Sequence, residues 1–170
     1  ALQDDQQRTT TIKLVAGSWG ATHAAASAPD SWAADAQHEV AIMTFEIQPH
    51  ASFTLPAASA GANRSLYFYK GDSVEIAGHS FTSHQAVELR AETPVSIING
   101  NETSSLLLLQ GRPINEPVAQ YGPFVMNSQA EIQQAFMEFQ QTQFGGWPWP
   151  RYDHVHPRER GRFARYPDGR

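Results

Sequence analysis

Histidine side chains are the clearest candidates for chemistry in this sequence, because imidazole nitrogens bind transition metals and titrate near neutral pH. His154 and His156 form an H-x-H pair between Pro150 and Pro157. The pair lies outside the predicted strands, where a closed metal site would need another chain to complete it. We therefore interpret both residues as part of a solvated tail.

Three further histidines lie near predicted turns. His79 and His84 are five residues apart, and His50 follows Pro49 at the end of a predicted strand. Two histidines on one rim can hold a metal loosely, but no carboxylate has a matching spacing. We interpret all three as loop residues and keep them as the candidate ligands of an unusual metal site.

Other kinds of catalytic site have little support. The sequence contains no cysteine, which excludes disulfides, thiolate metal sites and cysteine nucleophiles. It also contains no G-x-S-x-G nucleophile elbow and no phosphate-binding glycine-rich loop before its single predicted helix.

The elements that would position any site are short strands. We predict strands over residues 11–16, 38–48, 52–55, 65–70, 73–76, 86–91 and 95–98, with a turn or short strand over 78–84. In 38–48, the alternation predicts one shared face, made of Ala41, Met43, Phe45 and Ile47. Gly71-Asp72 predicts a hairpin between two of the strands. Short strands at this spacing, followed by one helix, indicate an antiparallel sandwich or jelly-roll barrel.

The stretch 104–127 lies between the predicted strand 95–98 and the predicted helix. Its four leucines, 106–109, predict a strand buried on both faces. The helix is predicted over about 128–144, where Ser128 and Glu131 have capping-box spacing and Gly145 follows its end. One helical face is predicted to be apolar, with Ile132, Ala135, Phe136 and Phe139.

Residues 106–150, LLLLQGRPINEPVAQYGPFVMNSQAEIQQAFMEFQQTQFGGWPWP, closely resemble the C-terminal domain of the pirin family. The leucine-rich strand, the G-x-P-x-x-E-P-V turn, the Y-G-P-F-V-M-N entry and the E-I-x-x-A helix match in order. A-G-x-x-G at 16–20 and N-R-S-L-Y-F-Y-K-G at 63–71 also fit. The resemblance covers about residues 12–150 and implies a cupin-type jelly roll. We therefore predict an all-β fold with one C-terminal helix, followed by an extended Arg-rich tail.

The resemblance also implies where a metal would bind. The family pattern is H-x-H, then a glutamate shortly before a strand that ends in glycine. The corresponding segment here, 53–71, has leucine, proline, alanine and serine in place of H-x-H, and Arg64 or its neighbours in place of the glutamate. We therefore predict no catalytic, cofactor-binding or metal-ligating residue in this chain. Fe(II) or another divalent metal is expected only in an N-terminal cupin that this chain lacks.

Composition adds weaker constraints. The 170 residues carry a formal charge of −5, which argues against a general phosphate-binding surface. Arginines concentrate at 151, 158, 160, 162, 165 and 170, but Asp153, Glu159 and Asp168 lie among them, so nucleic-acid binding is not expected. We predict a linker at 1–10, the cupin domain at 11–150 and an Arg-rich tail at 151–170. No apolar run approaches the roughly 20 residues of a membrane span, and we expect a cytoplasmic protein.

Three functions remain open. The first is a metal-free cupin half that packs against a metal-bearing N-terminal cupin or, without one, forms a homodimer through its uncovered apolar face. The second is a dioxygenase-like cupin of the quercetin 2,3-dioxygenase type, with His50, His79 and His84 as an atypical ligand set. The third is a jelly roll that binds a small aromatic ligand, since at least one of Tyr67, Phe68 and Tyr69 points inward.

Overall fold

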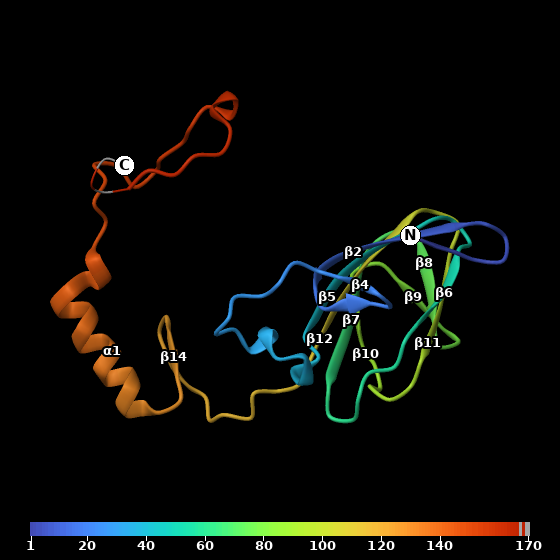
Figure 1. Cartoon of the computed structure of the whole chain (residues 1–170), viewed down its shortest axis with the longest axis horizontal. Helices are drawn as coiled ribbons and strands as arrows, with labels where there is room; N and C mark the ends of the chain where they lie inside the picture. Colours follow the sequence, from blue (N-terminus) through green and yellow to red (C-terminus); the bar gives the residue numbers. More distant parts are fainter. Residues whose placement is uncertain (167, 169–170) are drawn as a thin grey trace. The chain divides into compact units, whose positions relative to one another are not determined.

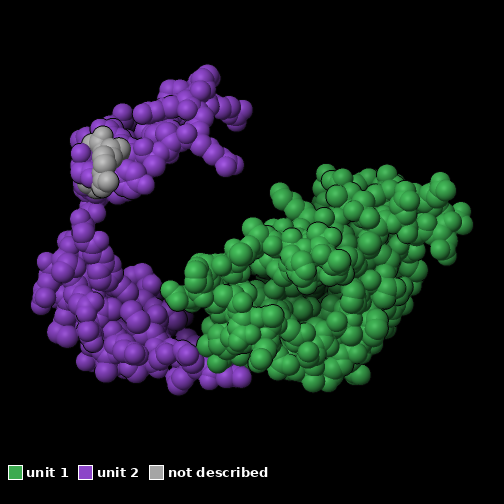
Figure 2. Space-filling model, viewed as in Figure 1, with its two compact units in different colours: residues 1–114 green, residues 115–170 purple. Residues whose placement is uncertain are grey.

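The computed structural model describes residues 1–166 and 168, and it divides into two compact units, Ala1–Ile114 and Asn115–Arg170 (Figure 2). We refer to them as unit 1 and unit 2. The predicted tail residue Arg170 lies outside the described residues.

Unit 1 consists of two main antiparallel sheets (Figure 1). The six-stranded sheet has the order β1 (Leu2–Gln3), β2 (Thr9–Ala16), β5 (Ala41–Ile47), β12 (Ser104–Gly111), β7 (Asn63–Lys70) and β10 (Gln85–Glu88). The four-stranded sheet has the order β6 (Ser52–Leu55), β11 (Val95–Asn99), β8 (Ser73–Ile76) and β9 (His79–Thr82). The predicted antiparallel β-sandwich is therefore confirmed.

The core lies between these sheets and follows from strict alternation along the strands. Ala41, Met43, Phe45 and Ile47 of β5 are all buried, as the sequence predicted. Leucine, phenylalanine, valine and isoleucine side chains from β6, β7, β8, β11 and β12 complete the same cluster. Phe68 is the inward-facing member of the aromatic run in β7, and it packs in this core.

The four leucines of β12 correct one prediction. Leu106 and Leu108 are fully buried, but Leu109 is 38% exposed and Leu107 is half-buried. The strand is central in its sheet, between β5 and β7, yet only its inner face contributes to the core of unit 1. The prediction of burial on both faces is therefore wrong for unit 1, and the outer face of β12 remains apolar and open.

The Gly71-Asp72 corner corrects a second prediction. β7 and β8 belong to different sheets and form no hairpin. Gly71 has φ +123°, and a Cβ there would collide with Ser104, so the chain changes sheets where only glycine fits. The Asp72 carboxylate accepts a hydrogen bond from the Asn101 backbone N–H at 3.2 Å. Bonds from backbone amides, first that of Ser73, lower the pKa of Asp72 to about 2.

The first ten residues, predicted as a linker, contribute β1. Leu2 pairs with Thr10 and packs against the core. The Asp4 carboxylate accepts a hydrogen bond from the Ser52 backbone N–H at 3.2 Å. The predicted domain limits 1–10, 11–150 and 151–170 stay predictions.

Between β2 and β5 the chain forms a segment rich in small residues. It contains the strand pair β3 (Ser18–Trp19) and β4 (Thr22–His23), followed by the short helices η1 (Trp32–Ala34) and η2 (Ala36–His38). Trp19 packs edge-on against Phe45 and Phe53 of the core. The Trp32 indole donates to the Arg112 carbonyl at 3.1 Å, so both tryptophans anchor this segment.

Unit 2 contains the hairpin β13 (Ala119–Tyr121) and β14 (Phe124–Met126), helix α1 (Gln129–Thr142) and the short helices η3 (Gln143–Gly145) and η4 (Arg158–Arg160). Half of the predicted capping box is present, because the Ser128 hydroxyl accepts from the Glu131 N–H. Glu131 Oε2 accepts from the N–H of Asn127, one residue before the N-cap, and not from that of Ser128. The helix ends earlier than predicted, at a left-handed Gln143.

The predicted apolar face of α1 packs on the β13–β14 hairpin. Ile132 and Ala135 are buried. Phe136 lies edge-on to Tyr121 and Phe124, with ring centroids 5.6 and 4.7 Å apart. Among the described residues, no helix is both long and apolar enough to span a bilayer.

Candidate functional site

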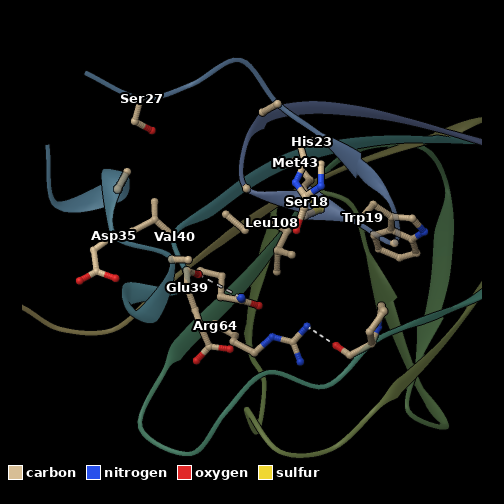
Figure 3. A pocket seen from close by; sticks show the side chains of 18 of the residues that line it. Ser18, Trp19, His23, Ser27, Asp35, Glu39, Val40, Met43, Arg64 and Leu108 are labelled. Atoms are coloured by element: carbon tan, nitrogen blue, oxygen red, sulfur yellow. Dashed lines mark hydrogen bonds between the residues drawn. The ribbon is translucent and has the colours of Figure 1, made fainter. Parts of the chain in front are cut away.

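A cavity of about 560 Å³ opens in unit 1 beside the segment between β2 and β5. Inward-facing residues of β5, β6, β7 and β12 line one side, and small residues of 17–36 line the other (Figure 3). Its apolar walls include Trp19, Met43, Leu55 and Leu108. We call this space the Arg64 cavity, after the charged side chain described next.

Arg64 is the largest fully buried side chain described, with 2% of its surface exposed. It follows the inward alternation of β7, in phase with Leu66 and Phe68. Its guanidinium donates to the carbonyl of Pro56 at 2.8 Å and to that of Ala91 at 3.3 Å. Its Nε–H has no hydrogen-bond partner. The barrel interior thus holds a cation that is satisfied only in part.

Glu39 lines the same cavity and is the carboxylate whose charge acts on Arg64, although its Oε2 makes no hydrogen bond. Its Oε1 accepts from the Ser59 N–H at 3.1 Å, and its Oε2 lies 3.5 Å from the Nε of Arg112. No ion pair links Glu39 and Arg64 among the described residues. Burial lowers the pKa of the Arg64 guanidinium, and the charge of Glu39 acts in the opposite direction. Arginine nevertheless stays protonated, so Arg64 carries its charge in the cavity.

The histidines singled out in the sequence do not assemble into a site. His50 and His84 occupy exposed turn positions with φ of +60° and +67°, and His79 is exposed in β9. No group of three or more histidine, aspartate or glutamate side chains in the described part of the chain could hold a metal ion. His23 does line the Arg64 cavity, at its exposed edge.

The H-x-H pair of the tail lies among aromatic side chains. The rings of His154 and His156 stack with centroids 6.0 Å apart, and Trp147 stacks on Tyr152. Both histidines line a cavity of about 350 Å³ within unit 2. Since this cavity also contains Arg165, whose guanidinium lies 4.9 Å from the ring centre of Trp149, it is a poor environment for a metal cation.

Sequence reasoning noticed Arg64 only as a replacement for a ligand and missed the cavity that it lines. The alternation of the strand could have shown that Arg64 points inward. Arg64 is two residues before Leu66 and four before Phe68, and both of these are core residues. Starting the strand at residue 65 rather than at 63, where β7 begins, hid that signal. The small residues of 17–36 carry no periodic pattern that would have placed them beside the barrel.

Comparison with known proteins gives a consistent family match. The family model that describes the pirin C-terminal cupin domain matches residues 42–145. The pirin of Homo sapiens is 31% identical over 107 residues, which are 61% of this chain and 37% of the human protein. Pirin-1 of Arabidopsis thaliana is 40% identical over 84 residues, which are 46% of this chain and 29% of the plant protein.

Solved structures support the fold. A crystal structure of quercetin 2,3-dioxygenase from Acinetobacter baumannii superposes with a TM-score of 0.65 at 22% identity, covering 84% of this chain and 49% of that one. The chain spans about a third of the length of the curated relatives it matches. These matches confirm the resemblance read from the motifs, together with the predicted all-β class.

Proposed function

The chain belongs to the pirin C-terminal cupin domain family, and from this premise we propose that it is a metal-free cupin that packs beside a metal-bearing N-terminal cupin. The observation that carries the proposal is Arg64. It puts a positive charge in the barrel, in the segment where the family resemblance sets Arg64 or its neighbours in place of a ligand glutamate. A buried cation repels a divalent metal ion. The relatives' length leaves room for a second domain.

Metal analysis tests the metal-free part of the proposal. Protein purified without a histidine tag and dialysed against Fe(II), Mn(II) or Ni(II) is expected to retain far less than one metal ion per chain, because no ligand cage opposes the charge of Arg64. Inductively coupled plasma mass spectrometry measures the content. Stoichiometric metal would contradict the proposal and favour the rival dioxygenase-like cupin with His50, His79 and His84.

The outer face of the six-stranded sheet supports the packing part of the proposal. Leu109 is paired with Ile42 on β5 and Leu107 with Tyr67 on β7. Leu109 and Tyr67 are each 38% exposed, while Ile42 and Leu107 are half-buried. Contiguous apolar side chains on a sheet face are typical of an interface. We propose that an N-terminal cupin covers this face in a longer protein.

Without that partner, two copies of the chain are expected to associate through the same face. Light scattering coupled to size exclusion at micromolar concentration should report a homodimer or larger assembly, and Leu109→Lys should shift it towards monomer. Ile98→Lys is the matched control, since Ile98 is 41% exposed but lies on the four-stranded sheet. A monomeric unsubstituted chain, or equal effects of the two lysines, would contradict this use of the face.

The predicted cytoplasmic location is part of the same proposal. It is supported by the absence of cysteine, which fits a reducing compartment. The interleaved acidic residues of the tail likewise favour a protein partner over nucleic acid.

A further inference from the structure

We propose that the Arg64 cavity binds a small organic monocarboxylate, with its carboxylate on the Arg64 guanidinium and its apolar body against the cavity wall. The inference rests on the metal-free barrel proposed above, because a metal at this place would compete for the same anion. The proposal gives this domain a ligand site in addition to the packing role proposed above.

The buried charge of Arg64 is only partly partnered. Buried arginine is rarely found without a paired anion, since removing its charge from water is costly. Arg64 has two carbonyl acceptors and no carboxylate within ion-pair distance among the described residues. Its Nε–H, buried and without a partner, belongs to a side chain that lines the cavity. A carboxylate on this edge of the guanidinium would supply the missing acceptor and a direct ion pair, which the charge of Glu39 does not provide.

The size and the apolar walls of the cavity suit a small organic molecule. The cavity volume of about 560 Å³ lies within the range of roughly 300–1,000 Å³ that is usual for small-molecule sites. The indole of Trp19 and the side chains of Met43 and Leu108 offer apolar surface on the same cavity. In Figure 3, Leu108 lies above the Arg64 side chain and Trp19 lies farther off, and a dashed line marks the bond from the guanidinium to the Pro56 carbonyl. An apolar body attached to the carboxylate therefore has a surface to contact.

Two carboxylates in the cavity limit the negative charge that a ligand can carry. Glu39 and Asp35 also line the cavity. Glu39 is held by Arg112 and Ser59, and Asp35 accepts from the Gln37 N–H at 2.8 Å. Neither is neutralised by Arg64, so a second negative charge on the ligand would face two carboxylates. This arrangement favours a monocarboxylate over a phosphate or a dicarboxylate.

Nuclear magnetic resonance of the ¹⁵N-labelled full chain tests the proposal with benzoate as the probe. Benzoate is expected to shift the Arg64 Nε–H signal and to titrate saturably. Benzamide, which has the same ring without the charge, should bind at least about tenfold more weakly, because charge-assisted hydrogen bonds are roughly twice as strong as neutral ones. Equal binding of the two probes, or no saturable shift at Arg64, would overturn the inference.

Substitutions give an independent readout. Arg64→Gln should abolish the preference for benzoate, whereas Arg90→Gln, at an exposed arginine outside the cavity, should leave it unchanged. If Arg64→Gln does not fold, Ala57→Trp is the second variant, because it fills the cavity from its exposed edge. Steric exclusion should then weaken the binding of benzoate at least about tenfold. An unchanged affinity for benzoate would overturn the inference. Metal content measured on the same sample separates the ligand-site proposal from the metal-free proposal. A metal-free chain that does not bind benzoate would contradict only the ligand-site proposal.

Discussion

Arg64→Glu is expected to lower the free energy of unfolding by about 3–5 kcal/mol, the usual cost of leaving a buried charge without its partners. The substitution removes the donors to the carbonyls of Pro56 and Ala91. It also places a carboxylate against those two carbonyl oxygens, in a cavity that Glu39 already lines. Urea denaturation followed by circular dichroism measures the change.

The matched control for this prediction is Arg90→Glu. Arg90 is an exposed arginine between β10 and β11, so the same change of charge should alter stability by no more than about 0.5 kcal/mol. If Arg64→Glu were as mild as Arg90→Glu, the guanidinium would not be an integral part of the barrel interior, and the account of the site would be wrong.

A comparably large effect is expected from Ile97→Ala, at about 2–5 kcal/mol of lost stability, because truncation leaves a cavity between the sheets. Ile97 is fully buried in β11, whereas the adjacent Ile98 is 41% exposed. Ile98→Ala should therefore cost at most about 1 kcal/mol. The two positions are adjacent in one strand and carry the same substitution. The difference in unfolding free energy between the two variants, measured by urea denaturation, therefore reports the difference in burial.

A reversed order of these two isoleucine variants would mean that β11 presents its other face to the core. Such a result would point to a register shifted by one residue, since successive side chains in a strand face opposite sides.

Strand positions and the core were predictable because alternation is a local signal. The face of β5 from Ala41 to Ile47 and the helix start at Ser128 depend on neighbours within a few residues, and both are found in the structure. Local signals failed where the chain passes between sheets. Gly71-Asp72 has the composition of a turn, but whether that turn joins two strands of one sheet depends on Ser104 and Asn101, which are about 30 residues away.

The candidate site was less predictable than the fold for the same reason. The Arg64 cavity joins β7 to residues from 17–36 and to Leu108, and no local pattern links these segments. The four leucines of β12 are a different case. Their composition predicts two covered faces, and unit 1 covers only one. That difference is a reason to expect a further surface that packs on Leu107 and Leu109.

We propose that the guanidinium of Arg64 takes the place of a metal cage inside this barrel. Crystals soaked anaerobically in Fe(II), with diffraction data collected at the iron absorption edge, test it most directly. We predict no anomalous peak within unit 1, and Arg64 bonded to the carbonyls of Pro56 and Ala91 as in this structure. An iron peak inside the barrel, held by protein side chains, would contradict the account.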